Sequence, residues 1–327
     1  MNSDALSLLH AHLLDALSSP PDEARRLFHG RGRRWQGLEQ VTIDWLNGAV
    51  LVSLFKEPDA TEMTGLREIL EALSQSPTWL NSGAHALLLQ HRYLQDSSTE
   101  WLLGEPVDNG VITEHGLHYK LDFGRNQNTG LFLDMRYGRN WVKAHSQGKR
   151  VLNLFAYTCG FSVAAIAGDA GQVVNLDMSK AALNRGRENH RLNQHDLSRV
   201  SFLGHDLFKS WARVKRDGPY DLIIIDPPSF QKGSFVLTKD YQKILRRLPD
   251  LLNPQGTVLA CHNDPSIGAE FLIDNMAIEA SRLSFQYRLE NPPEFADEQA
   301  GGGLKALVFL LDTPSLMGED STAPREQ

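Results

Sequence analysis

The first part of the chain consists of short amphipathic segments, some with apolar residues at helical spacing and others with apolar residues at every second position. Leucines recur at near-helical spacing in residues 1–19, which predicts a helix. Apolar and polar residues then alternate on both sides of Asn47-Gly48, a pair that favours a two-residue hairpin turn. A second alternating pattern surrounds His115-Gly116. Together these elements predict a small α+β domain over residues 1–125.

From Gly148 onward, apolar runs alternate regularly with segments of helical spacing. The predicted strands cover 150–155, 172–177, 200–204, 221–226 and 256–262, and the predicted helices cover 161–168, 179–193, 206–215, 238–252 and 265–280. This order is typical of a mostly parallel sheet covered by helices. Strands over 283–290 and 304–311 flank a proline- and glycine-rich connection and predict a closing antiparallel hairpin. The expected fold class is therefore α/β, with a Rossmann-like sheet over 126–312 and a disordered, polar tail over 313–327.

Residues 150–178 have the order of a nucleotide-binding βαβ unit, ending on an acidic residue. Its loop has one glycine, Gly160, whereas a dinucleotide pyrophosphate needs close backbone approach at several glycines. The loop therefore favours a cofactor without phosphates, such as S-adenosylmethionine, over NAD. We expect Asp177 to bind its ribose and Asp206 its adenine amine. The candidates in this half of the site are Tyr157, Thr158, Gly160, Asp177, Met178 and Asp206.

Acidic residues follow consecutive predicted strands at Asp177, Asp206 and Asp226. Each of them is also a good helix N-cap, which is the usual role of a single such aspartate. In an open parallel sheet, however, ligands bind at the carboxyl ends of the strands. Their recurrence next to a glycine-containing first loop favours a ligand site.

The motif Asp226-Pro227-Pro228-Ser229-Phe230 follows a very apolar strand. The prolines fix an extended backbone and remove two N–H donors, which leaves carbonyl groups and the Asp226 carboxylate for a substrate. Phe230 offers a stacking face for a flat base. The alternative is a rigid loop that only ends the strand.

Composition narrows these possibilities. The chain has 327 residues and a net charge of −7, which argues against non-specific coating of nucleic acid. Cys159 and Cys261 are the two cysteines, too few for a disulfide framework or a zinc site. No apolar run has the length of a membrane span, and the N-terminus lacks the pattern of a signal peptide, so we expect a cytoplasmic protein.

Although the chain is acidic overall, the segment from Arg25 to Arg34 is rich in arginine. Its arginines are interleaved with Phe28, His29 and Trp35. Such a cluster suits contacts with RNA backbone and bases. A solvated loop is the equally good alternative.

Four segments resemble one enzyme family, the bacterial large-subunit ribosomal RNA methyltransferases. They are TGLFLDMR, LNLFAYTCGFSVAA, VVNLDMSKAALNRGRENHRLN and DLIIIDPPSF, and the resemblance covers roughly residues 30–312. Those enzymes are class I S-adenosylmethionine-dependent methyltransferases that make 5-methylcytosine or N7-methylguanine. The resemblance implies this fold and cofactor, with ribosomal RNA as the partner. Residues 1–25 are too short for the PUA module of some members, so we expect that module to be absent.

The resemblance also gives a role to the segment Thr129 to Arg136. It implies that Phe132, Asp134 and Arg136 lie close to the cofactor. From the residues alone, the alternative is a linker strand in which Leu131 and Leu133 are buried.

The acceptor atom depends on the residue after the fifth strand. Methylation at C5 of a pyrimidine needs a thiolate that adds at C6. The position of that cysteine in the family holds Asn263 here, and Cys261 lies on the same strand face but about 7 Å deeper. Asparagine at this place resembles the N7-guanine branch, in which the base nitrogen already carries an in-plane lone pair. The predicted acceptor residues are Asp226, Pro227, Pro228, Phe230 and Asn263, with Asp226 also next to the cofactor.

Other functions stay open at this point. Because of Cys261, a 5-methylcytosine enzyme is the first alternative. Methylation of an exocyclic amine is a further alternative, but enzymes of that kind have the aromatic residue directly after the prolines, whereas Ser229 intervenes here. A non-catalytic RNA-binding or assembly protein that retains the cofactor fold is the alternative from another class. The chain carries no pattern that indicates an oligomeric state.

Overall fold

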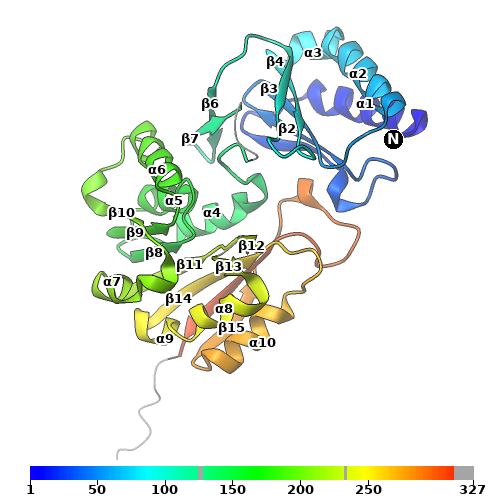
Figure 1. Cartoon of the computed structure of the whole chain (residues 1–327). Helices are drawn as coiled ribbons and strands as arrows, with labels where there is room; N and C mark the ends of the chain where they lie inside the picture. The colour runs from blue at the N-terminus through cyan, green and yellow to red at the C-terminus, as the bar shows by residue number, and fades with distance from the viewer. Residues whose placement is uncertain (124–127, 232–233, 313–327) are drawn as a thin grey trace, which may run out of the picture.

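The structure is a computed structural model that describes residues 1–123, 128–231 and 234–312 (Figure 1). Two sheets organise the chain, one near the N-terminus and a larger one built from residue 150 onward. The predicted tail over 313–327 lies outside the described residues, as does the predicted domain boundary between 125 and 126. Among the described residues, no helix has the length and apolar character needed to cross a membrane.

The N-terminal sheet has the strand order β1-β2-β3-β4-β5. Its strands are β1 (Arg25–His29), β2 (Val41–Leu46), β3 (Ala49–Leu54), β4 (Ala86–His91) and β5 (Thr99–Leu103), with helices α1 (Ser3–Ser18), α2 (Ala60–Ser74) and α3 (Pro77–Ser82). Leucines of α1 and α2 pack on apolar side chains of β2 and β3 in one buried cluster. Asn47 and Gly48 have φ of 52° and 93°, which confirms the predicted hairpin turn.

The second predicted hairpin is also present and lies against the larger sheet's helices. It consists of β6 (Asn109–Glu114) and β7 (Leu117–Asp122), and β7 packs beside α6 (Lys180–Leu192). Backbone amides of β7 donate to the side chains of Asn189 and Asn193. A 3-10 turn, η2 (Leu133–Met135), and α4 (Arg136–Ala144) then lead into the larger sheet.

The larger sheet has the order β10-β9-β8-β11-β14-β16-β15. The strands are β8 (Arg150–Leu154), β9 (Gln172–Asp177), β10 (Val200–Gly204), β11 (Tyr220–Ile225), β14 (Leu252–His262), β15 (Leu283–Arg288) and β16 (Lys305–Leu311). Strands β8 to β11 and β14 pair in parallel, whereas β16 runs antiparallel to both β14 and β15. The predicted Rossmann-like α/β fold with a closing antiparallel hairpin is confirmed.

Alternate residues of these strands face opposite helical layers, as the pleat of a strand requires. Val151 and Leu222 face α4 and α5 (Gly160–Ala167). Their neighbours Leu152 and Ile223 face a cluster that includes α8 (Leu237–Leu245) and α10 (Glu270–Glu279). The sheet is thus buried on both faces, so its strands read as continuous apolar runs.

Some elements differ from the sequence prediction. The helix expected over 206–215 is a 3-10 turn, η4 (Leu207–Lys209), followed by α7 (Trp211–Arg216). The helix expected over 238–252 divides into α8 and α9 (Leu248–Leu251), where Pro249 occupies a first-turn position. The basic segment contains the edge strand β1, which the sequence analysis did not predict. Most side chains of β1 are half-buried, so its sequence does not show the alternation of apolar and polar residues that indicates a strand.

Candidate cofactor and acceptor site

A cavity of about 540 Å³ lies at the carboxyl ends of β8, β9, β10, β11 and β14. This is within the usual size of a cofactor or ligand pocket. Most of the predicted site residues line it together: Phe132, Asp134, Tyr157, Asp177, Met178, Asp206, Asp226, Pro227, Pro228, Phe230 and Asn263. Segments far apart in the chain therefore meet at one edge of the sheet.

The loop after β8 holds an unusual backbone. Phe155, Tyr157 and Cys159 have φ of 56°, 48° and 62°, a left-handed region that costs energy for residues other than glycine. Close packing holds the turn, because Gly186 of α6 leaves room for the Cys159 side chain: a Cβ there would lie 2.3 Å from the Cys159 Sγ. Strain of this kind is concentrated at functional sites in proteins.

Asp177 is anchored by this loop. Its Oδ2 accepts a hydrogen bond from the Tyr157 amide at 2.8 Å, and its Oδ1 accepts from the Ser179 amide at 2.7 Å. Burial nevertheless raises the pKa of Asp177, which outweighs the lowering by these two bonds. A carboxylate has about four acceptor sites, so Asp177 retains capacity for the hydroxyls of a ribose.

Asp206 combines both roles considered for it. Its Oδ1 accepts from the Phe208 amide at 2.9 Å and so caps η4, while the side chain also lines the cavity. Capping uses one oxygen and leaves acceptor capacity for an amine donor.

Apolar side chains that were not predicted as site residues form part of the cavity. Phe208 and Phe235 lie nearly parallel, with ring centroids 6.5 Å apart, and Phe155 meets Phe235 edge-on at 5.1 Å. Leu176 and Leu207 line the same region. These side chains give the cavity, which Asp177 and Asp206 also line, an apolar wall that fits an adenine base. Their positions in the sequence could have identified them, because most of them are next to the strand-end aspartates or in the first loop.

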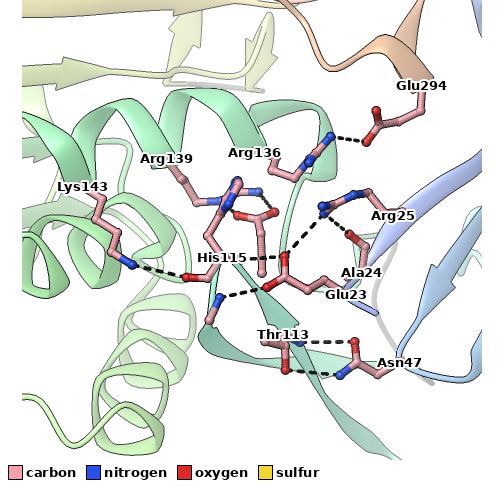
Figure 2. Close-up of polar contacts among 12 residues, drawn as sticks. Glu23, Ala24, Arg25, Asn47, Thr113, His115, Arg136, Arg139, Lys143 and Glu294 are labelled. Atoms are coloured by element: carbon pink, nitrogen blue, oxygen red, sulfur yellow. Dashed lines mark hydrogen bonds and ion pairs between the residues drawn. The ribbon is translucent and has the colours of Figure 1, made fainter. Parts of the chain in front are cut away.

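Some predicted cofactor residues lie outside the cavity lining. The Thr158 hydroxyl donates to the Gly130 carbonyl at 2.6 Å, and Gly160 begins α5 with Leu131 packed close to its Cα. Arg136 is absent from the cavity lining and donates to Glu294 at 2.7 Å (Figure 2). These residues fix the segments around the cavity instead of lining it.

Arg139 fixes the segment that contains Phe132 and Asp134. Its guanidinium makes a bidentate, buried ion pair with Glu114 of β6, at 2.6 and 2.7 Å. It also donates to the Phe132 carbonyl at 2.9 Å. Figure 2 shows Arg139 on its helix, α4, near His115 of the turn between β6 and β7.

Two carboxyl groups stand close together in the cavity wall. Burial, followed by the nearby Asp134 charge, raises the pKa of Asp226 to about 7, and Arg139 opposes this shift. Burial also raises the pKa of Asp134. Asp226 therefore exchanges a proton near neutral pH, a common property of catalytic and binding groups.

The acceptor side of the cavity carries Phe230, which is 65% exposed. Ser229 donates to the Asn263 Oδ1 at 3.4 Å, which connects the Asp-Pro-Pro loop to the end of β14. Cys261 is fully buried in β14, and burial raises the pKa of its thiol well above the usual value. Within the described residues, neither cysteine lines the cavity, and no cluster of ligand side chains is arranged for a metal ion.

Comparison with known proteins gives consistent similarities. A family profile of S-adenosylmethionine-dependent methyltransferases matches residues 25–310. The chain is 40% identical over 152 residues to ribosomal RNA large subunit methyltransferase I of Erwinia tasmaniensis, covering 45% of this chain and 38% of that protein. It is 29% identical over 255 residues to ribosomal RNA large subunit methyltransferase K/L of Hahella chejuensis, covering 72% and 34%. The chain spans about two fifths of the length of the first of these relatives.

Solved structures show the same fold. A methyltransferase structure from Streptococcus mutans superposes with a TM-score of 0.82 at 24% identity, covering 94% of this chain and 81% of that one. A methyltransferase crystallised with S-adenosylhomocysteine gives a TM-score of 0.79 at 24% identity, covering 94% and 80%.

Proposed function

This chain belongs to the S-adenosylmethionine-dependent methyltransferase family, and we propose that it methylates a base of ribosomal RNA, with N7 of guanine as the acceptor. One observation carries the proposal: the Asp-Pro-Pro-Ser-Phe loop and Asn263 line the same cavity as Asp177 and Asp206. Cofactor groups and acceptor groups thus face one space. The names of the ribosomal RNA methyltransferases that the chain resembles support RNA as the substrate.

In this proposal the cofactor supplies an electrophilic methyl group on a sulfonium. Asp177 accepts from the ribose hydroxyls, Asp206 accepts from the adenine amine, and the apolar wall that includes Phe208 contacts the adenine. The strained first loop orients Asp177, because its Tyr157 amide donates to that carboxylate. These groups bind and orient the methyl donor, and none of them takes part in proton transfer.

The acceptor base needs positioning more than activation. N7 of guanine has an in-plane lone pair, so alignment with the methyl group and exclusion of water supply most of the barrier reduction. Phe230 stacks on the base. The Asn263 amide donates to the guanine O6, and the Asp226 carboxylate accepts from the Watson–Crick edge. Because the base becomes positively charged on methylation, a carboxylate in this low-dielectric wall stabilises the transition state.

The buried thiols support N7 over C5 of cytosine. A C5 mechanism requires a thiolate at the base, whereas Cys261 is buried and its raised pKa favours the neutral thiol. Asn263 follows β14 directly and lines the cavity.

Nucleoside mass spectrometry tests the proposal directly. Deproteinised ribosomal RNA from a strain lacking the gene is incubated with the protein and S-adenosylmethionine that carries a deuterated methyl group. We expect the label in 7-methylguanosine, and we expect Cys261→Ala to retain it. Label in 5-methylcytidine that disappears in Cys261→Ala would overturn the acceptor atom, and absence of label in any nucleoside would overturn the RNA methyltransferase itself.

A further inference from the structure

A second cavity, of about 260 Å³, adjoins the first across a shared wall. Asn128, Phe132, Asp134 and Asn263 line both cavities. The other side of the second cavity belongs to the N-terminal sheet, and it includes Arg26, His29, Arg31, Phe55 and Arg92. A group bound there would lie beside the proposed acceptor site.

Two arginines of this cavity are stacked on the same ring. The guanidinium carbons of Arg31 and Arg92 lie 4.2 and 4.8 Å from the centre of the Phe55 ring. Both guanidinium groups therefore make a cation–π contact with the Phe55 ring, and such a contact orients the guanidinium plane.

These arginines differ from their basic neighbours in their partners. Arg26 forms an ion pair with Asp44 at 2.6 Å, and Arg33 forms one with Asp297 at 3.2 Å. In the part of the chain that the structure describes, Arg31 and Arg92 have no ion-pair partner, and the buried Nε of Arg92 has no hydrogen-bond partner. Arg92 donates a hydrogen bond to the Asn128 Oδ1 at 3.1 Å.

The charges around the cavity favour an anion. Burial lowers the pKa of Arg31 and of Arg92, and the neighbouring arginine charges lower them further, so the cations repel one another. The acidic side chains that line the cavity are Asp44, which Arg26 already pairs, and Asp134 in the shared wall. Burial and the adjacent Arg26 and Arg31 charges lower the pKa of His29 to about 4, so this ring is neutral at pH 7.

We propose that Arg31 and Arg92 bind a phosphodiester group of the RNA, next to the nucleotide whose base enters the cofactor cavity. The inference rests on the proposed function and adds a second substrate subsite to it. Guanidinium groups match phosphate oxygens with paired N–H donors, and an anion between them relieves their mutual repulsion. The subsite adds a backbone contact beside Asn263, which lines both cavities, and so strengthens RNA binding next to the acceptor site.

The test compares two double variants that remove the same charge. Arg31→Gln/Arg92→Gln changes the subsite, whereas Arg33→Gln/Arg34→Gln changes arginines of the same segment that do not line the cavity. The probe is the deproteinised ribosomal RNA described above, and the readouts are KM and kcat for methylation and the salt dependence of filter binding. Calorimetry with S-adenosylmethionine and thermal melting report on the cofactor site and on folding.

We expect the subsite variant to raise KM for RNA about tenfold or more, with kcat at saturating RNA and cofactor affinity within about twofold of wild type. The slope of log binding constant against log salt should fall by about 0.7 for each lost phosphate contact. The control variant should retain the wild-type KM and slope. Arg31→Lys/Arg92→Lys, which keeps the charge but loses the paired donors, should give an intermediate KM.

Two results would overturn the inference. One is an active enzyme whose KM and salt slope are unchanged in the subsite variant, and the other is an equal effect in both double variants. If the glutamine pair does not fold, the lysine pair decides, and a wild-type KM there also overturns the subsite. A wild-type protein that binds this RNA with the predicted arginine dependence but transfers no methyl group would instead refute the proposed function and leave the subsite standing.

Discussion

At the scale of single residues, Asp226 combines the features that the site depends on. Its place after an apolar strand was predictable, because strand and motif are both local patterns. Its proximity to Asp134 was not predictable from local pattern, since η2 and the end of β11 meet only in the folded chain. The same holds for Phe208 and Phe235, whose stacking needs segments from different elements.

The first prediction at this scale concerns the pH dependence of methyl transfer. The carboxylate form of Asp226 is the proposed hydrogen-bond acceptor, and its pKa is about 7. We therefore expect kcat/KM to rise with pH up to about 7 and then to level off, since this ratio reports the free enzyme. Initial rates between pH 5.5 and 8.5 measure it. Asp226→Asn should lower kcat by roughly 100-fold or more and remove the inflection; an inflection that persists in this variant would contradict the role.

Asp226 also has a predictable effect on stability. Because the pKa of Asp226 is raised, the folded protein binds a proton at pH values where the unfolded chain has released it. This proton binding stabilises the folded state fully below the unfolded pKa near 4, and the stabilisation is lost as pH rises through about 7. We expect Asp226→Asn to be more stable than wild type at pH 8, by roughly 1–3 kcal/mol, and to differ less at pH 5. Urea unfolding at both pH values measures the difference. Equal differences at pH 5 and pH 8 would show that this carboxyl is not strained by burial.

At the scale of elements, the periodicity of the sequence predicted most strands and helices, because buried parallel strands are continuous apolar runs. Edge strand β1 escaped prediction because its half-buried arginines resemble a loop. The β1 strand gives some residues of the basic segment a structural role, because Phe28 is buried in the core and Arg26 forms an ion pair with Asp44. The left-handed backbone of the first loop also escaped prediction, since tertiary packing against α6 imposes it.

The contact between α6 and the first loop gives the next prediction. A Cβ at Gly186 would meet the Cys159 Sγ at 2.3 Å and its Cβ at 2.8 Å, so Gly186→Ala must displace the loop. We expect a loss of roughly 1–3 kcal/mol and a weaker affinity for S-adenosylmethionine, measured by thermal melting and calorimetry. Cys159→Ala in the same chain should restore part of both, because it removes the Sγ contact. Strictly additive effects of the two substitutions would contradict this packing.

At the scale of the whole molecule, the N-terminal sheet and the larger sheet meet where substrate subsites are proposed. The alternation of elements predicted a mostly parallel larger sheet with a closing antiparallel hairpin, but it did not predict the order of the strands. The approach of Arg92 to Asn128 and Asn263 was not predictable either, because these residues come from separate parts of the chain. The ion pair of Arg33 with Asp297 connects the segment after β1 to the loop before β16. Arg139 with Glu114 and Arg136 with Glu294 join α4 to β6 and to the 3-10 turn η5 (Pro293–Phe295) (Figure 2).

The buried Arg139–Glu114 pair should dominate this junction. Their side chains are 5% and 1% exposed, so Glu114→Gln leaves a buried guanidinium without its counter-charge. We expect a loss of about 3–5 kcal/mol in the free energy of unfolding, together with weaker cofactor binding, because Arg139 also holds the Phe132 carbonyl. The matched control is Glu188→Gln, whose pair with Lys120 is 44% and 32% exposed and should cost less than about 1 kcal/mol. Urea unfolding and calorimetry compare the two. Similar losses in both variants would mean that surface charge, and not this buried pair, joins β6 to α4 and positions the wall shared by the two cavities.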